Sequence, residues 1–195
     1  MKLCSKAITS INSHPALFLD RDGVINLDHG YVHVRENFDF MPGIFELVLT
    51  AKANGYLCIV VTNQAGIGRG LYTLGDFRAL SEWMCGKFKA NGAEIDAIYY
   101  SPFHPTKGKG AYLVQESTRK PGFGMFTEAI KELNIDISKS IMVGDKVSDM
   151  QASIAANIGR HYLLRPNASC DILYELDSKV NLINSLSEIN FNFVE

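Results

Sequence analysis

The chain alternates short apolar runs with longer helical patterns, and this alternation restricts its fold more than any other feature. Five runs have the length and the β-branched or aromatic content of strands: ALFL (16–19), LCIVV (57–61), IDAIYY (95–100), SIMVG (140–144) and RHYLL (160–164). A short sixth strand is expected near 180–183. Near-continuous apolar runs are typical of strands buried on both faces of a parallel sheet. The pattern therefore predicts an α/β fold with a Rossmann-like sheet and helices on both faces.

Helical patterns fill most of the intervals between the strands. They span about 43–53, 73–90, 122–133 and 147–156. Pro42 suits the first turn of the first helix, and Ser185 with Glu188 matches a capping box before a last one. The interval 101–118 is longer than most α/β connections, so we expect a substrate-loop insertion there. We expect one domain over 1–195, because no segment is long enough for a large cap domain.

Composition excludes several classes of partner. Hydrophobic residues make up 47% of the 195 residues, charged residues 21%, and the net charge is -2. With no basic stripe and no apolar stretch of bilayer length, neither nucleic acid nor a membrane is expected as a partner. The four cysteines form no CxxC pair, so no disulfide framework is predicted. A cytoplasmic monomer is the expectation.

Polar side chains follow several of the predicted strands. They are Asp20 and Asp22, Thr62 and Asn63, Arg119 and Lys120 after the insertion, and Asp145 and Lys146. Ligands of open parallel sheets bind at the carboxyl ends of the strands, so these residues are expected to meet. A divalent cation would make the clustered acids tolerable. Carboxylates of Asp20 and Asp145, with a backbone carbonyl near Asp22, suit Mg²⁺ better than zinc.

This residue set suits phosphoryl transfer. A carboxylate that attacks phosphorus forms an aspartyl phosphate and divides one displacement into two easier ones. Asp20 is the candidate nucleophile, and Asp22 is the candidate general acid and then base. Lys120 and the Thr62 hydroxyl are placed to stabilise charge on the transferring oxygens. The DxDG fragment alone is equally typical of a turn or a calcium loop, so the assignment depends on the whole set.

Four segments resemble a known family. FLDRDGVI, VVTNQ, RKP and VGDKVSDMQA resemble, in order, the four motifs of the haloacid dehalogenase superfamily of phosphatases. Within it, DRDGVINLDHGYVH, TNQAGIGRG and IYYSPFHP resemble the heptose bisphosphate phosphatases, over roughly residues 16–165. The resemblance implies Mg²⁺-dependent removal of the 7-phosphate from D-glycero-D-manno-heptose 1,7-bisphosphate, through an aspartyl phosphate. The reaction would serve bacterial heptose-nucleotide synthesis for lipopolysaccharide or S-layer.

The resemblance also implies residue roles. The catalytic residues would be Asp20, Asp22, Thr62, Asn63 and Lys120, and the Mg²⁺ site would be Asp20, Asp22 and Asp145. Substrate-binding residues are expected at His29, Gln64, Arg69, Arg119 and Lys146. Arg69 is expected to reach the distal sugar phosphate, and Arg119 to clamp a phosphate. Asp149 is either a second acid near the metal or a first-turn residue favoured by the helix dipole.

One departure from the resemblance concerns zinc. Members of this subfamily often carry a Cys-x-His element before the insertion and a Cys-x-Cys element directly before RKP. This chain has Ser101 and Phe103 at the first pair and Glu116 and Thr118 at the second. Because no thiolate is left there, no structural zinc is expected. Stoichiometric zinc in the purified protein would contradict this.

Three alternatives stay open at this point. Histidinol-phosphate phosphatase resembles the chain in the same motifs. A phospho-accepting signalling domain also uses clustered aspartates, Mg²⁺, a hydroxyl and a lysine, but it lacks a substrate-sized insertion. A polynucleotide 3'-phosphatase is disfavoured by the near-neutral charge.

Overall fold

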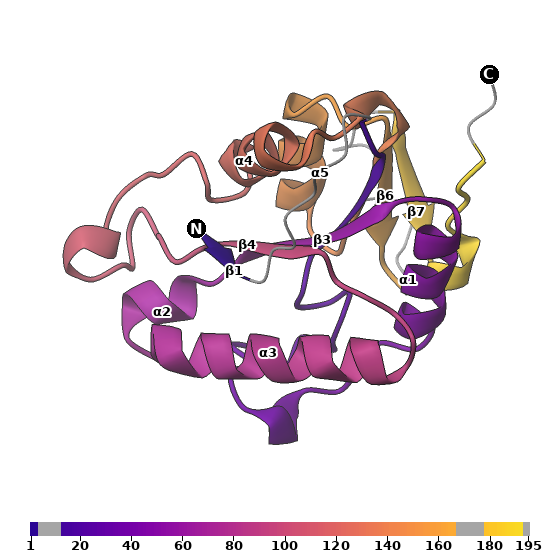
Figure 1. Ribbon diagram of the computed structural model, residues 1–195. Coiled ribbons are helices and arrows are strands. Elements are labelled where there is room, and N and C mark those ends of the chain that lie inside the picture. Colours follow the sequence, from indigo (N-terminus) through magenta and orange to yellow (C-terminus); the bar gives the residue numbers. More distant parts are fainter. Residues whose placement is uncertain (4–12, 167–177, 193–195) are drawn as a thin grey trace.

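A single mixed sheet forms the centre of the computed structural model, which describes residues 1–3, 13–166 and 178–192 (Figure 1). Its strand order is β1-β4-β3-β2-β5-β6-β7. The strands are β1 (Lys2–Leu3), β2 (Ala16–Leu19), β3 (Leu57–Asn63), β4 (Ala97–Ser101), β5 (Ile141–Gly144), β6 (Arg160–Leu164) and β7 (Val180–Ile183). From β2 to β7 all neighbours are parallel, and β1 lies antiparallel to β4 at one edge. The predicted parallel sheet is confirmed, including the short strand near 180–183.

Helices lie on both faces of the sheet. They are α1 (Ile44–Ala53), α2 (Ala65–Arg69), α3 (Leu74–Ala90), α4 (Gly124–Leu133) and α5 (Val147–Ala155). Short 3-10 turns span Arg35–Asn37, Gly110–Tyr112, Ile137–Lys139 and Leu186–Glu188. The capping box at Ser185 forms, but it starts only the last of these turns and not the full helix expected there. No helix in the described ranges has the length and apolar character needed to cross a bilayer.

Strand side chains alternate between two cores. Leu17, Leu19, Val60 and Val143 pack under α1 and α3, whereas Phe18 faces α4 and α5 with its strand neighbours. All five are fully buried. This arrangement explains why the strand runs are apolar at every position and not at alternate ones. Cys58 lies in the first core as a buried side chain, while Cys4 and Cys170 lie outside the described residues.

The insertion after β4 docks on the short helix α2. In Figure 1 it extends beyond the sheet edge beside α2. The Lys109 amide donates to the Gly68 carbonyl at 2.8 Å, and a side chain at Gly68 would overlap the Pro102 carbonyl. The insertion thus packs directly on the backbone of α2, where Gly68 leaves room for it. Tyr112 packs against the core, whereas Leu113 stays exposed.

Hydroxyl groups occupy the base of the insertion. Thr118 Oγ1 donates to Ser101 Oγ at 3.3 Å, and Arg119 Nη1 donates to the Phe103 carbonyl at 3.1 Å. The first of these contacts joins Ser101 and Thr118, two of the positions at which a zinc-binding relative would carry cysteines. The expected absence of zinc stays a prediction.

The topology reverses direction at β2. From β2 the chain proceeds outward to β3 and β4 on one side, and β5, β6 and β7 continue on the other. The carboxyl ends of β2 and β5 thus adjoin at the switch point of the sheet, where open α/β sheets bind ligands. Asp20 follows β2 there, and its amide donates to the Val143 carbonyl of β5 at 3.0 Å.

We predict that Asp96→Asn lowers the free energy of unfolding by about 2 to 3 kcal/mol, because it weakens a buried ionic hydrogen-bond network. The Asp96 carboxylate accepts from Lys52 Nζ at 2.8 and 2.9 Å and from the Cys58 amide at 2.7 Å. Urea denaturation measures the loss. Asp39→Asn, which alters an exposed pair with His29, is the control and should cost less than about 1 kcal/mol. Equal losses would contradict the account.

Candidate active site

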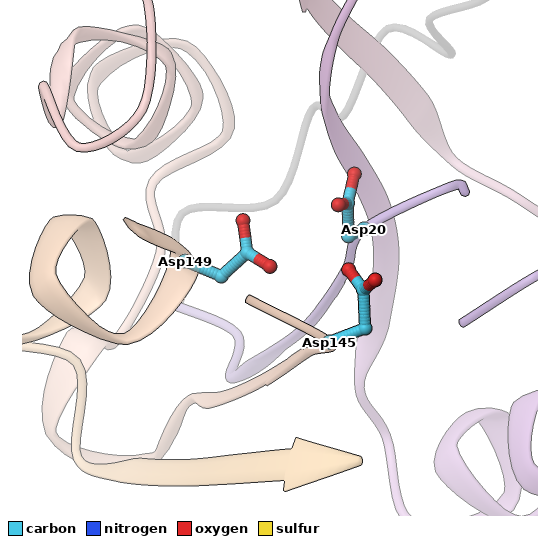
Figure 2. Close-up of side chains that lie close together, drawn as sticks. All are labelled: Asp20, Asp145 and Asp149. Atoms are coloured by element: carbon cyan, nitrogen blue, oxygen red, sulfur yellow. The ribbon is translucent and has the colours of Figure 1, made fainter. Parts of the chain in front are cut away.

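Three carboxylates from two segments converge beyond the ends of β2 and β5. Figure 2 shows the side chains of Asp20, Asp145 and Asp149 lying close together. One ligand atom from each lies within 4.8 Å of the others. Asp20 and Asp149 are buried, and Asp145 is partly buried. Asp145 Oδ1 is buried and has no hydrogen-bond partner in the described part of the chain, so it is an open ligand atom.

Lys120 is the cation at the centre of this cluster. Its ammonium pairs with Asp20 Oδ1 at 3.0 Å and with Asp149 Oδ1 at 2.8 Å, and it donates to the Val61 carbonyl at 2.8 Å. The side chain is 1% exposed, so these charges interact with little screening by water. Burial opposes its charge, but the pairs with Asp149 and Asp20 outweigh burial and raise the pKa of Lys120. Lys120 is therefore a permanent cation.

The single positive charge of Lys120 does not balance the negative charges of three carboxylates. Burial raises the pKa of Asp20 to about 7; Lys120 opposes the rise, and the neighbouring charges of Asp149 and Asp145 add to it. Burial likewise raises the pKa of Asp145 to about 6, with Lys146 opposing the rise. The site thus carries an excess of negative charge that a bound cation would offset.

Asn63 holds the backbone of Lys120. Its Nδ2 donates to the Lys120 carbonyl at 3.0 Å, and its Oδ1 accepts from the Lys120 amide at 3.0 Å. The Asn63 amide thus bonds to both backbone groups of Lys120, as the backbone of a neighbouring strand would, although the two residues are 57 positions apart in the sequence. Its expected contact with phosphate stays a prediction, although Asn63 does border the cleft described below.

Asp22 lies beside the cluster and accepts every hydrogen bond that reaches it. Arg21 donates from Nη2 to both carboxylate oxygens at 2.9 Å. Asn26 Nδ2 adds a bond to Oδ1 at 3.1 Å, and Gln64 Nε2 adds one to Oδ2 at 3.1 Å. The Asp22 side chain is 16% exposed, whereas its partner Arg21 is buried. The carboxylate is therefore fixed in orientation but still reachable from solvent.

An open cleft of about 560 Å³ borders this site. Among the residues predicted from the sequence, it is lined by Asp22, Asn63, Arg119, Lys120 and Lys146. These residues come from four segments that are distant in the sequence. The structure thus brings them to one face, next to the buried carboxylate of Asp20.

Three residues predicted to bind substrate are not among the residues that line the cleft. His29 is exposed and its Nε2 lies 2.8 Å from Asp39 Oδ2. Gln64 is buried and its amide is fully used by protein groups. Arg69 contacts the Tyr31 hydroxyl and ring. Their expected contact with substrate stays a prediction.

Of four other residues that line the cleft, two lie in the segment 28–33, which was expected to line the pocket, and two were not predicted from the sequence. Asp28, Tyr31, Tyr72 and His104 also border the cleft. Lys146 Nζ reaches Asp28 Oδ2 at 3.0 Å and so ties the segment after β2 to the start of α5. The sequence offered one signal for this segment, namely that it directly follows the predicted nucleophile. Nothing local marked Tyr72 or His104.

A buried carboxylate paired with a lysine, at the switch point of a parallel sheet and beside a second reachable acid, suits a hydrolase that works through an aspartyl phosphate. Residues 112–161 match the family model described as haloacid dehalogenase-like hydrolase. The chain is 54% identical over 149 residues to D-glycero-alpha-D-manno-heptose-1,7-bisphosphate 7-phosphatase of Burkholderia mallei, covering 76% of this chain and 79% of that one. It belongs to the haloacid dehalogenase-like hydrolases, among the heptose bisphosphate phosphatases, and it is a phosphatase.

Two further comparisons agree. The D-glycero-beta-D-manno-heptose-1,7-bisphosphate 7-phosphatase of Vibrio cholerae is 50% identical over 151 residues, covering 77% of this chain and 81% of that one. A crystal structure of a HAD-like phosphatase from Mesorhizobium loti superposes with a TM-score of 0.84 at 30% identity, covering 96% of this chain and 88% of that one. The signalling-domain alternative is therefore excluded.

We predict that Asp20→Asn stabilises the metal-free protein, and more so at pH 8 than at pH 5. The pKa of Asp20 is about 7 in the fold, against an ordinary value of 3.8 for an aspartate. Because the folded state binds the extra proton between these values, its stability falls as pH rises toward 7. Asparagine removes this loss, so the gain should be about 2 kcal/mol larger at pH 8.

Urea denaturation in EDTA at both pH values measures the effect, with Asp39→Asn as the exposed control. A gain that is equal at both pH values, or a loss at pH 8, would contradict the assigned pKa of Asp20.

Proposed function

We propose that the protein removes the 7-phosphate of D-glycero-D-manno-heptose 1,7-bisphosphate through an aspartyl phosphate on Asp20. The observation that carries the chemistry is the buried Asp20 carboxylate, held by Lys120 at 3.0 Å at the edge of an open cleft. The substrate is supported by the names of the relatives, at 54% and 50% identity. Bacterial heptose-nucleotide synthesis and a cytoplasmic monomer are parts of the same proposal.

The donor set fits Mg²⁺. All the candidate ligands are oxygens, and Asp145 Oδ1 is buried without a hydrogen-bond partner in the described ranges. Asp20 and Asp145 would hold the ion, with the backbone carbonyl of Asp22 as a further ligand. When bound, Mg²⁺ supplies positive charge that lets a phosphate dianion approach a carboxylate.

Asp149 is assigned a different part. Its Oδ1 pairs with Lys120 at 2.8 Å, and its Oδ2 accepts from the Lys146 amide at 3.0 Å at the start of α5. With both oxygens used, Asp149 serves to cap the helix and to hold Lys120, and it is not needed as a metal ligand. Asp149 is thus a residue of the first helical turn, as one of the two alternatives expected, and it also contacts Lys120 directly.

The first chemical step uses the unoccupied oxygen of Asp20. Oδ1 accepts from the Arg21 amide at 2.7 Å and pairs with Lys120, whereas Oδ2 receives no hydrogen bond in the described ranges. We assign Oδ2 as the nucleophile. A bond forms between Oδ2 and phosphorus, the bond from phosphorus to the sugar oxygen breaks, and Asp22 transfers a proton to that oxygen.

The second step regenerates the enzyme. Asp22, now a carboxylate, takes a proton from water, the water oxygen bonds to phosphorus, and the bond to Asp20 Oδ2 breaks to release phosphate. Lys120 stabilises the returning negative charge on Asp20. Arg119 and Lys146 border the cleft and supply positive charge for the sugar bisphosphate.

The proposal predicts rapid release of phosphate from position 7 of the heptose bisphosphate in Mg²⁺, with the 1-phosphate left on the product. Both anomers should be tried, because the two relatives are named for different anomers. Histidinol phosphate and the heptose 1-monophosphate are the comparison substrates. A value of kcat/KM at least roughly 100-fold higher for the bisphosphate is expected, since the second phosphate adds charged contacts.

Preference for histidinol phosphate would discard the heptose assignment and keep the catalytic one. Absence of turnover of any phosphomonoester would overturn both.

A further inference from the structure

Gln64 is buried between two catalytic groups, yet the reaction steps above do not use it. It is 1% exposed, at the junction of β3 and α2. Nε2 donates to Asp22 Oδ2 at 3.1 Å and to Thr62 Oγ1 at 2.9 Å, and Oε1 accepts from the Tyr72 hydroxyl at 2.6 Å. All the polar atoms of the amide are therefore engaged by protein groups.

The Tyr72 hydroxyl fixes which way the amide faces. A flipped amide would place Oε1 against the Asp22 carboxylate, where two acceptors repel each other. Burial raises the pKa of Tyr72 to about 12, so its hydroxyl keeps its proton at neutral pH. Nε2 is thereby directed at Asp22 and Thr62.

The surroundings hold Tyr72 rigidly. Its ring stacks on His33 with centroids 5.1 Å apart and planes 6° apart. A side chain at Gly66 would overlap the ring, so α2 passes directly against it. The glycine in this segment is thus explained by the approach of Tyr72, without a phosphate-binding role.

The Gln64 amide also decides in which direction the Thr62 hydroxyl can donate its hydrogen bond. Its hydroxyl accepts the hydrogen bond from Gln64 and donates none among the described residues. A hydroxyl whose lone pair is occupied in this way keeps its own hydrogen available for an anionic oxygen. Thr62 is 1% exposed, so bulk water does not compete for the hydrogen of its hydroxyl.

We infer that Gln64, anchored by Tyr72, is a positioning residue that orients the Asp22 carboxylate for proton transfer and turns the Thr62 hydroxyl hydrogen toward the transferring phosphoryl group. The inference rests on the proposed acid/base role of Asp22, but not on the heptose as substrate. It replaces the expected direct contact of Gln64 with substrate.

Gln64→Met, which keeps length and removes the amide, tests the inference through the leaving group. The measured quantity is kcat/KM, which reports the step that expels the leaving group. Two substrates are compared: p-nitrophenyl phosphate, whose leaving group needs little protonation, and a sugar phosphate that the wild type hydrolyses. If Asp22 loses its orientation, the loss on the sugar phosphate should be about 10-fold greater than on the aryl phosphate, because only the alkoxide needs the acid.

Tyr72→Phe should give the same pattern at smaller amplitude, since Gln64 stays but its amide is no longer anchored. Tyr99→Phe is the matched control. It also removes a tyrosine hydroxyl bonded to a side-chain oxygen, here Glu132 Oε2 at 2.8 Å, on the α4 side of the sheet. Its two kcat/KM values should stay within about twofold of wild type.

Equal losses on the two substrates would overturn the inference, as would a Tyr72→Phe variant indistinguishable from Tyr99→Phe. Because any hydrolysed sugar phosphate serves, failure of the heptose assignment does not affect the result. Thermal melting of each variant separates loss of fold from loss of orientation.

Discussion

The ammonium of Lys120, buried between Asp20 and Asp149, is the interaction on which the site depends. Without this cation, three carboxylates could not share a pocket so far removed from water, since burial already raises the pKa of two of them. The surrounding contacts serve to keep Lys120 there: Asn63 pairs with its backbone, and the Val61 carbonyl takes its third hydrogen. Asp20, the proposed nucleophile, is thus held by a lysine from the far end of the insertion.

The sheet provides the geometry that this interaction requires. β2 and β5 are neighbours at the point where the strand order reverses. The residues directly after each strand therefore meet, and neither strand needs a long loop to bring them together. Two hydrophobic cores pack against the opposite faces of the sheet and hold the strands in place. The insertion then packs on the backbone of α2 through Lys109 and Gly68.

Much of this could be predicted from the sequence, because the strand runs are strongly apolar and the ends of parallel strands must meet. Lys120 comes only after the insertion that follows β4, but Asp20, Thr62 and Asp145 follow from that rule alone. The partners of individual side chains do not. Asn63 and Gln64 adjoin Thr62 in sequence and were expected to touch substrate. In the fold, Asn63 bonds to the backbone of Lys120, and Gln64 bonds to Asp22 and Tyr72. The helical patterns expected from the sequence did not include α2, against whose glycines the insertion and Tyr72 pack.

The most direct test of the central claim is to locate the transferred phosphoryl group. Asp22→Asn should hydrolyse the intermediate slowly, so acid quenching during turnover of p-nitrophenyl phosphate, followed by peptide mass analysis, should find one phosphoryl group on Asp20. The same treatment of the Asp20→Asn/Asp22→Asn double variant should find none. A phosphoryl group on Asp145 or Asp149, or a double variant that is still labelled, would contradict the account.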